Sequence, residues 1–333
     1  MKGQIFKIFS DLYYVKNADG NTFQCKIREV LKKQKASVVT GDFVEFENNV
    51  ILNILPRKSF IKRPAVANVD QIIIVSALKE PNLDFNQLDR YIALAKYYNI
   101  PIILCFNKED LGLENDMQDR IISIYEDLGY KTLFTSALEK KGIKDLYKVL
   151  KGKTSALCGN SGVGKSSLVN ALNPNVHLKT KSVSDKINRG THTTRHCEIV
   201  ALDENSGIID TPGFSNVKFD FILPAQVDSL FDDISKYNKE CKYSDCLHIN
   251  ETGCEVLANI ENIPQSRYES YLSFVKEAFE YKEKVKYNGR KTESHQKLHN
   301  NKSIVKISEK KRQGSRNTRK QMIYKELENN ENE

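Results

Sequence analysis

The sequence predicts a multidomain protein: a small N-terminal β-barrel, a central α/β domain and a C-terminal metal-binding helical module. Three observations lead to this prediction. Short strand-like segments dominate the start of the chain, strands and helices alternate from residue 68, and Cys and His gather between residues 241 and 254. We place the domains at 1–62, 68–220 and 221–281, followed by a basic, flexible tail at 282–333.

The composition argues against a membrane protein and for a reducing compartment. The 333 residues are 40% hydrophobic, with a mean hydropathy of -0.50. No run approaches the ~18 apolar residues of a membrane-spanning helix, and the segment after Met1 lacks the long apolar stretch of a signal peptide. Four of the seven cysteines stand singly, as buried reduced thiols do: Cys25, Cys105, Cys158 and Cys197. We expect a cytoplasmic protein without membrane contact, and a monomer.

Positive charge is concentrated near the C-terminus. Between Lys282 and Lys320 there are 14 Lys or Arg against three Glu, which exceeds the net charge of +8 for the whole chain. This distribution indicates a polyanion partner, such as RNA, for the tail rather than for the whole protein. A merely solubilising tail is the alternative, and the acidic end at 326–333 weakens a uniformly RNA-binding picture.

The first domain is predicted from five short strands separated by turns. They cover residues 3–9, 12–15, 22–26, 43–47 and 50–54. Five strands in a segment of this length suit a small Greek-key barrel such as an OB-fold. Such barrels often bind oligonucleotides, but many are plain protein-contact modules, so the pattern leaves both roles open.

The second domain is predicted from alternating strands and helices. The apolar run at 71–77 is typical of a strand buried on both faces. Further strands are expected at 101–106, 131–134, 154–158, 196–202 and 206–209, with helices at 85–98, 115–128, 142–150 and from 166. This order favours a parallel, doubly wound sheet, whose motifs fall at the carboxyl ends of the strands.

A phosphate-binding loop lies between the strand at 154–158 and the helix that follows it. Two glycines, a lysine and a hydroxyl at fixed spacing define the motif. Backbone N–H groups and the helix dipole face an anion, and the glycines allow close approach. Lys165 would reach the β and γ phosphates, and Ser166 would bind Mg²⁺. The predicted contact residues are Gly159, Asn160, Ser161, Gly162, Val163, Gly164, Lys165, Ser166 and Ser167.

A guanine-reading motif follows the strand at 101–106. The Asp110 carboxylate can accept hydrogen bonds from N1–H and the exocyclic amine of guanine, which adenine does not offer. Asn107 would support the loop, and the stem of Lys108 would cover the base. Ser136 and Ala137 would complete the pocket through their backbone.

The γ-phosphate motif comes last, at the end of the strand at 206–209. Asp210 would hold Mg²⁺ through water, and the Gly213 N–H would meet the γ-phosphate. Base-reading motifs therefore precede the phosphate loop, the reverse of the order in ordinary GTPases. A circular permutation leaves the strand neighbours unchanged, so the sheet can still close.

Four metal-ligand side chains lie close together in the third domain. Cys241, Cys246, His248 and Cys254 offer three thiolates and one imidazole, a full tetrahedral set for one structural Zn²⁺. Because the spacing differs from that of common zinc fingers, the density of cysteines carries the prediction. Unrelated buried thiols are the alternative. Helical spacing at 268–281 adds a helix after the cluster.

Together these motifs resemble the ribosome small subunit-dependent GTPase A family (RsgA, also called YjeQ). The resemblance covers residues 1–280 and includes the barrel, the permuted motif order and the Cys/His cluster. It implies a circularly permuted P-loop GTPase that acts late in small ribosomal subunit maturation. It further implies binding to the subunit and its 16S rRNA, and stimulation of GTP hydrolysis by that subunit.

The segment between the phosphate-loop helix and the strand at 196–202 should contain the first switch. By match to the family, Thr194 would close over Mg²⁺ and the γ-phosphate. Ordinary enzymes place a water-orienting Gln just after Asp-x-x-Gly, but this chain has Phe214 there. His192 is then the nearest side chain able to position the attacking water, a role that the resemblance also suggests. An exposed loop histidine is the alternative, and Thr191 departs from the Arg that family members often carry.

The sequence thus predicts a GTP hydrolase that uses Mg²⁺ with GTP and carries one structural Zn²⁺. Two other classes stay open. One is a P-loop kinase or ATPase, but the motif at Asn107–Asp110 argues against it because this motif recognises guanine and not adenine. A GTP-gated RNA-binding module with little intrinsic catalysis would be compatible with Phe214.

Overall fold

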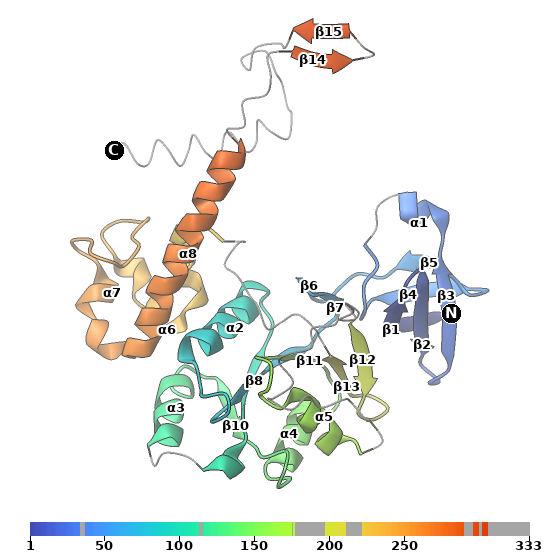
Figure 1. Ribbon diagram of the computed structural model, residues 1–333, viewed down its shortest axis with the longest axis horizontal. Helices are drawn as coiled ribbons and strands as arrows, with labels where there is room; N and C mark the ends of the chain where they lie inside the picture. Colours follow the sequence, from blue (N-terminus) through green and yellow to red (C-terminus); the bar gives the residue numbers. More distant parts are fainter. Residues whose placement is uncertain are drawn as a thin grey trace.

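The computed structural model describes residues 1–33, 37–112, 116–174, 176, 197–210, 222–289, 296–299 and 302–305 (Figure 1). It contains the three parts that the sequence predicts: a β-barrel, an α/β domain and a helical module with a Cys/His cluster. In Figure 1 the α/β domain lies between the other two, and both make contact with it. Within the described part of the chain, no helix is long and apolar enough to cross a membrane.

The N-terminal domain is a closed five-stranded barrel, as expected for an OB-like fold. Its strands are β1 (Lys2–Phe9), β2 (Leu12–Asn17), β3 (Thr22–Ile27), β4 (Phe43–Glu47) and β5 (Val50–Ile54), and the short helix α1 (Glu29–Lys33) follows β3. β3 runs parallel to β5, and β4 pairs with β1, which closes the barrel. Alternate side chains point inward, and six fill the core: Ile5, Val15, Cys25, Val44, Phe46 and Ile51.

The barrel is joined edge to edge to the α/β domain. β1 pairs with β12 (Glu198–Ala201) at Lys7 and Glu198, so the two sheets form one 11-stranded sheet. The Thr40 hydroxyl donates a 2.9 Å hydrogen bond to the carbonyl of Cys197 beside this joint. A hairpin of β6 (Phe60–Lys62) and β7 (Ala65–Ala67) connects the two domains along the chain. This joint has no local signal in the sequence.

The α/β sheet has the strand order β10-β9-β8-β11-β13-β12. Five strands are parallel: β8 (Gln71–Ala77), β9 (Ile102–Asn107), β10 (Lys131–Phe134), β11 (Thr154–Cys158) and β13 (Gly207–Asp210). β12 is antiparallel to β13, a difference from the fully parallel sheet expected from the sequence. The reason is the tight turn between them, closed by the hydrogen bond from Leu202 N to Ser206 O, which only antiparallel strands can use.

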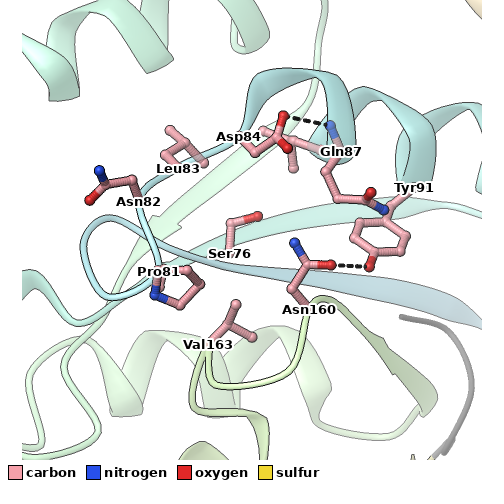
Figure 2. A pocket seen from close by; sticks show the side chains of 11 residues that line it. Ser76, Pro81, Asn82, Leu83, Asp84, Gln87, Tyr91, Asn160 and Val163 are labelled. Carbon is pink, nitrogen blue, oxygen red and sulfur yellow. Dashed lines mark hydrogen bonds between the residues drawn. The ribbon is translucent and has the colours of Figure 1, made fainter. Parts of the chain in front are cut away.

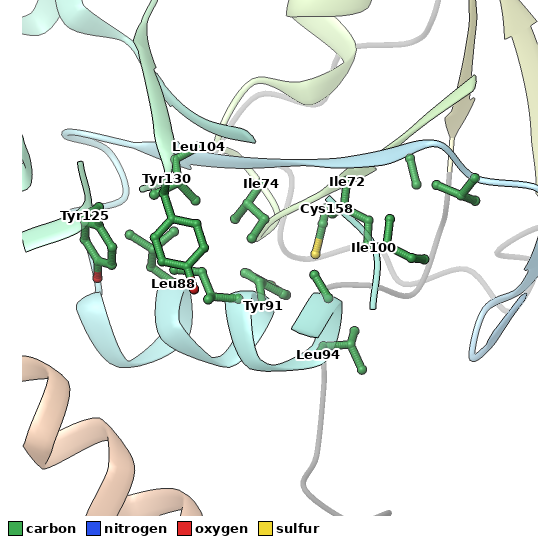
Figure 3. Close-up of a cluster of buried hydrophobic side chains, with 14 of the residues drawn as sticks. Ile72, Ile74, Leu88, Tyr91, Leu94, Ile100, Leu104, Tyr125, Tyr130 and Cys158 are labelled. Carbon is green, nitrogen blue, oxygen red and sulfur yellow. The ribbon is translucent and has the colours of Figure 1, made fainter. Parts of the chain in front are cut away.

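Helices cover both faces of this sheet. α2 (Phe85–Tyr97) and α3 (Met117–Tyr125) pack on one face, and α4 (Ile143–Leu150) and α5 (Lys165–Leu172) on the other. The side chains of β8 alternate between the two cores, with Ile72 and Ile74 on the α2 side and Ile73 and Val75 on the other. Figure 3 shows the first core between β8 and α2. Burial on both faces explains the unbroken apolar run of this strand.

The C-terminal module packs short helices against one long helix. α8 (Gln265–Gly289) is the long helix, and α6 (Asp232–Ser235) and α7 (Glu255–Ala258) lie against it (Figure 1). The helical spacing predicted for 268–281 places Tyr271, Phe274 and Ala278 in the core, all with 0% exposure, whereas Phe279 is 36% exposed. In the tail, β14 (Gln296–His299) and β15 (Lys302–Val305) form a hairpin that the sequence did not lead us to expect.

Candidate nucleotide site and metal centre

The predicted nucleotide motifs meet at one edge of the α/β sheet. Asn107 ends β9, Ser136 follows β10, Gly159 follows β11 and Asp210 ends β13. All four strands are parallel, so their carboxyl ends lie side by side. Only β8 lies between β9 and β11 in the sheet. The base-reading and phosphate-binding motifs at the ends of β9 and β11 are therefore close together, although their order along the chain is reversed.

The phosphate loop takes a conformation that only glycine allows at two positions. Gly159 has a φ of 145°, and a Cβ there would lie 2.1 Å from the carbonyl oxygen of Val75. Gly164 has a φ of 94°, and a Cβ there would lie 2.3 Å from Nδ2 of Asn107. Lys165 Nζ donates to the carbonyls of Gly159 (2.7 Å) and Asn160 (2.8 Å), and therefore folds over the loop that would surround a phosphate chain.

Asn107 ties the base-reading segments to the phosphate loop. Its side chain is 2% exposed. Nδ2 donates to the carbonyl of Val163 at 2.9 Å, while Oδ1 accepts from Thr135 Oγ1 and Ala137 N, both at 3.2 Å. One amide thus connects the end of β9 to the loop after β10 and to the phosphate loop, and its Nδ2 fills the space that a side chain at Gly164 would need. This arrangement gives the expected supporting role of Asn107 a physical basis.

The loop after Asn107 presents Asp110 at the site. Lys108 has a φ of 66° and its Nζ donates to the Glu80 carbonyl, so its stem is held across the loop. Asp110 Oδ1 accepts a 2.5 Å hydrogen bond from Ser136 Oγ, which orients the carboxylate while leaving its other oxygen for a ligand. A second bond, from Glu139 N to Ser136 Oγ at 3.0 Å, holds the serine in place.

Most, but not all, of the predicted nucleotide residues lie in the described part of the chain. The predicted residues between Asn107 and Ser167 are all described, and Ser166 and Ser167 lie in the first turn of α5. Asp210 is described by its backbone only, at the end of β13. His192, Thr194 and Gly213 lie outside the described residues. Their roles and the Mg²⁺ ligands therefore stay predictions.

A hollow lies beside the phosphate loop, between that loop and the N-terminal turns of α2 (Figure 2). Ser76 and Pro81 line it from β8 and the segment after it, and Val163 lines it from the phosphate loop. At its edge the hydroxyl of Tyr91 donates a 2.8 Å hydrogen bond to Oδ1 of Asn160. The sequence gives no signal for this contact, because Tyr91 occupies an ordinary core position of an amphipathic helix.

The four predicted metal ligands converge. Their ligand atoms all lie within 4.8 Å of one another. Nδ1 of His248 is 3.3 Å from Sγ of Cys254 and 3.6 Å from Sγ of Cys241, and these two sulfurs are 3.9 Å apart. Ligand atoms around a tetrahedral Zn²⁺ are separated by about 3.5–3.8 Å, so the Cys₃His set fits one zinc ion with no position left for substrate.

The surroundings of the cluster also suit a metal. Nε2 of His248 is buried without a hydrogen bond and faces Oδ2 of Asp228 at 3.7 Å, the carboxylate-to-histidine arrangement common behind zinc ligands. Tyr268 donates from its hydroxyl to the His248 carbonyl at 2.8 Å. Burial raises the pKa of Cys246 to about 12 and also raises that of Cys254, so a bound cation would have to displace their protons. Asp228 lies too far from the cluster in sequence to be found from spacing.

Three family models match the chain. The model described as the RsgA N-terminal domain matches residues 2–50, and the one described as RsgA GTPase matches residues 54–220. A further model, described as 50S ribosome-binding GTPase, matches residues 154–287. The first two meet at the end of the barrel, shortly before the chain enters the α/β domain.

Relatives align along most of the chain. A small ribosomal subunit biogenesis GTPase RsgA from Alkaliphilus metalliredigens is 39% identical over 285 residues, spanning 83% of this chain and 97% of the relative. One from Geobacillus sp. (strain WCH70) is 40% identical over 291 residues, spanning 84% and 98%.

Two solved structures are also similar. YjeQ from Thermotoga maritima has a TM-score of 0.72 at 32% identity and covers 84% of this chain and 98% of its own. YloQ, described as a circularly permuted GTPase, has a TM-score of 0.69 at 30% identity, with 84% and 95% covered. The permuted order seen in the motifs therefore has a counterpart in a solved fold.

Proposed function

The chain belongs to the RsgA family of circularly permuted GTPases, and from this membership we propose that it hydrolyses GTP during late maturation of the small ribosomal subunit. The observation that carries the proposal is the Asn107 side chain. It bonds the base-reading loops to the phosphate loop, so guanine recognition and phosphate binding form one site. The Asp110 carboxylate argues against an ATP-binding kinase or ATPase, because adenine does not offer the two neighbouring donors that this carboxylate would bind in guanine.

Within this site we propose distinct roles for the predicted residues. Asp110 accepts hydrogen bonds from guanine, and the backbone of Ser136 and Ala137 borders the base. Backbone N–H groups of 159–164 surround the phosphates, together with Lys165. Gly213 N–H meets the γ-phosphate at the end of the phosphate chain.

When bound with GTP, Mg²⁺ would neutralise negative charge on the phosphates. Ser166, Thr194 and Asp210 are the residues proposed to hold it. His192 is proposed to position the attacking water, because Phe214 replaces the usual water-orienting Gln. A cytoplasmic location and a monomeric state stay predictions from the sequence.

We propose a structural role for the metal centre and an RNA-binding role for the barrel and tail. One Zn²⁺ held by Cys241, Cys246, His248 and Cys254 would fold the loop between α6 and α7, since all four positions are filled by protein. The small subunit and its 16S rRNA are the proposed partners, in keeping with the names of the relatives. The charge of 282–320 supports a polyanion partner for the tail.

GTP turnover with and without purified small ribosomal subunits tests this proposal. The wild type, His192→Ala and the control His196→Ala, which changes a second histidine of the same segment, are compared by phosphate release. We expect slow turnover alone, strong stimulation by the subunit, and loss of stimulation only in His192→Ala. An excess of ATP should not compete with GTP.

The other outcomes separate the parts of the proposal. Stimulation that persists in His192→Ala would remove the role of His192 and leave the GTPase intact. Nucleotide-dependent binding to subunits without turnover would favour the GTP-gated RNA-binding module that Phe214 keeps open. Turnover unaffected by subunits would contradict the ribosomal role.

A further inference from the structure

Helix α2 of the α/β domain lies between the sheet of that domain and the C-terminal module of residues 222–289, called the zinc module below after its proposed metal, and its two faces make different contacts (Figures 1 and 3). Leu88, Tyr91, Ile92 and Ala95 belong to the core beneath β8. Ala93, which follows Ile92 on the same helix, belongs to the core of the zinc module. A single helix of 13 residues therefore carries side chains into both domains.

The inner face reaches the phosphate loop through one hydrogen bond. Tyr91 is 2% exposed and donates from its hydroxyl to Oδ1 of Asn160 at 2.8 Å (Figure 2). Burial raises the pKa of Tyr91 well above its usual range, so the hydroxyl keeps its proton and stays a donor. Asn160 is also held by its main chain, whose carbonyl accepts from Lys165 Nζ.

The outer face is fastened to the zinc module by three ion pairs. Arg267 of α8, with 0% exposure, donates to Oδ1 of Asp89 at 2.6 Å and also bonds to Asp233 of α6.

The other two pairs involve basic residues of α2. The guanidinium of Arg90 bonds twice to the Glu277 carboxylate, at 2.7 Å and 2.5 Å. Lys96 pairs with Asp232 at 2.5 Å. These pairs hold the helix at two places, at Asp89 and Arg90 in its second turn and at Lys96 in its last turn, so the helix cannot shift without breaking them.

We propose that α2 couples the zinc module to the phosphate loop, with Tyr91 as the residue that positions Asn160 and the ion pairs with α8 as the contacts that hold the helix. When Lys165 turns toward bound phosphates, its bonds to the loop carbonyls are given up. The Tyr91 hydroxyl then becomes the side-chain contact that keeps Asn160 in place. A displacement of α8 would move Tyr91, and with it the loop that holds the nucleotide.

This inference rests on the proposed function only in assuming that a guanine nucleotide binds at the phosphate loop. Its test is the dissociation rate of a fluorescent GDP analogue from the full-length protein. Tyr91→Phe removes one hydroxyl and Asn160→Ala removes its acceptor. Each should raise the rate about 3- to 10-fold, the range for one neutral hydrogen bond, and the double variant should show no further rise.

The second arm tests the link to the zinc module. Glu277→Gln weakens the pair with Arg90 without removing bulk, and Glu280→Gln, an exposed carboxylate on the same helix, is the matched control. Glu277→Gln should raise the dissociation rate about 2- to 3-fold in the wild-type background but not in Tyr91→Phe. Glu280→Gln should leave it unchanged. Zinc content and melting temperature, measured on every variant, separate positioning from loss of folding.

The results that overturn the inference differ from those that overturn the proposed function. An unchanged rate in Tyr91→Phe, or a double variant whose effects add, would exclude the positioning role. Equal effects of Glu277→Gln in both backgrounds would show that the zinc module does not act through Tyr91. A wild type that binds no guanine nucleotide would instead contradict the proposed function.

Discussion

At the scale of single residues, the site depends on polar side chains that bond in more than one direction. Asn107 joins the loop after β10 to the phosphate loop, and Ser136 orients the carboxylate of Asp110. Such preorganisation means that binding does not have to order these groups at the same time, which favours affinity and selectivity together.

Selectivity for guanine should invert when Asp110 is changed to Asn. The Asn amide keeps an acceptor for Ser136 but offers a donor toward position 2 of the base, which suits the carbonyl of xanthine instead of the amine of guanine. We expect GDP affinity to fall about 100-fold or more and xanthosine diphosphate to bind better than GDP, since two charge-assisted bonds are lost. Competition binding with both nucleotides measures this. Unaltered GDP affinity would show that Asp110 does not read the base.

The glycine at 164 should be irreplaceable for reasons of space as well as backbone angle. In Gly164→Ala the new Cβ meets Asn107 Nδ2, so we expect lost nucleotide binding and about 1–3 kcal/mol less stability. Gly129→Ala is the control, because Gly129 has a φ of 83° but no other atom lies within 4 Å of the place its Cβ would occupy. Denaturant unfolding and GDP titration of both variants compare the two effects. Equal losses would mean that only the angle matters.

At the scale of elements, short helices and loops of the C-terminal module need a cross-link to hold their shape. α6 and α7 have four residues each, too few to be stable alone in water. The loop between them turns around the Cys/His cluster, and the Glu251 carboxylate accepts from the backbone N–H groups of Leu247, Ile249 and Asn250. A bound cation at the centre would fix all of these parts at once.

Metal removal should therefore unfold this module and spare the α/β sheet. Wild-type protein should contain one zinc per chain, and Cys254→Ser should contain none, whereas Cys25→Ser, in the barrel core, should keep it. With a chelator, amide exchange should become fast in residues 232–258 and stay slow in β8 and β11. Full zinc retention in Cys254→Ser would contradict the assigned ligand set.

At the scale of the whole molecule, the three parts are joined by contacts that differ in kind. The barrel continues the α/β sheet through the β1–β12 pairing, while the C-terminal module is attached by a buried ion cluster around Arg267. β12 follows the segment that should contain the first switch, and α2 borders the phosphate loop. Both outer domains are therefore attached beside the nucleotide site.

Loss of Arg267 should loosen this assembly. Arg267→Met leaves the carboxylates of Asp89 and Asp233 buried without their partner, and we expect about 3–5 kcal/mol less stability in denaturant unfolding. Lys148→Met is the control, since its pair with Asp145 is exposed to solvent, and it should change nothing measurable. A small loss in Arg267→Met would show that the apolar contacts around α8 hold the module by themselves.

The sequence by itself determined the domain order, the OB-like barrel, the permuted motif order and the four members of the Cys/His cluster. Each of these features depends on residues that are close together in the sequence. They are the glycines at 159 and 164, the polar residues directly after apolar strands, and the four predicted metal ligands within one short segment. Local patterns of this kind can be read without knowing which distant residues they will meet.

Only the tertiary structure decided which residues connect these parts. That Arg267 would be buried against Asp89, that Tyr91 would bond to Asn160, and that β1 would extend the sheet at β12 has no trace in local patterning. Such contacts join residues far apart in the chain, and their partners are selected by how whole helices and strands pack. Periodicity reports that a side chain faces a core, and the packing of the folded chain determines which core and which neighbour.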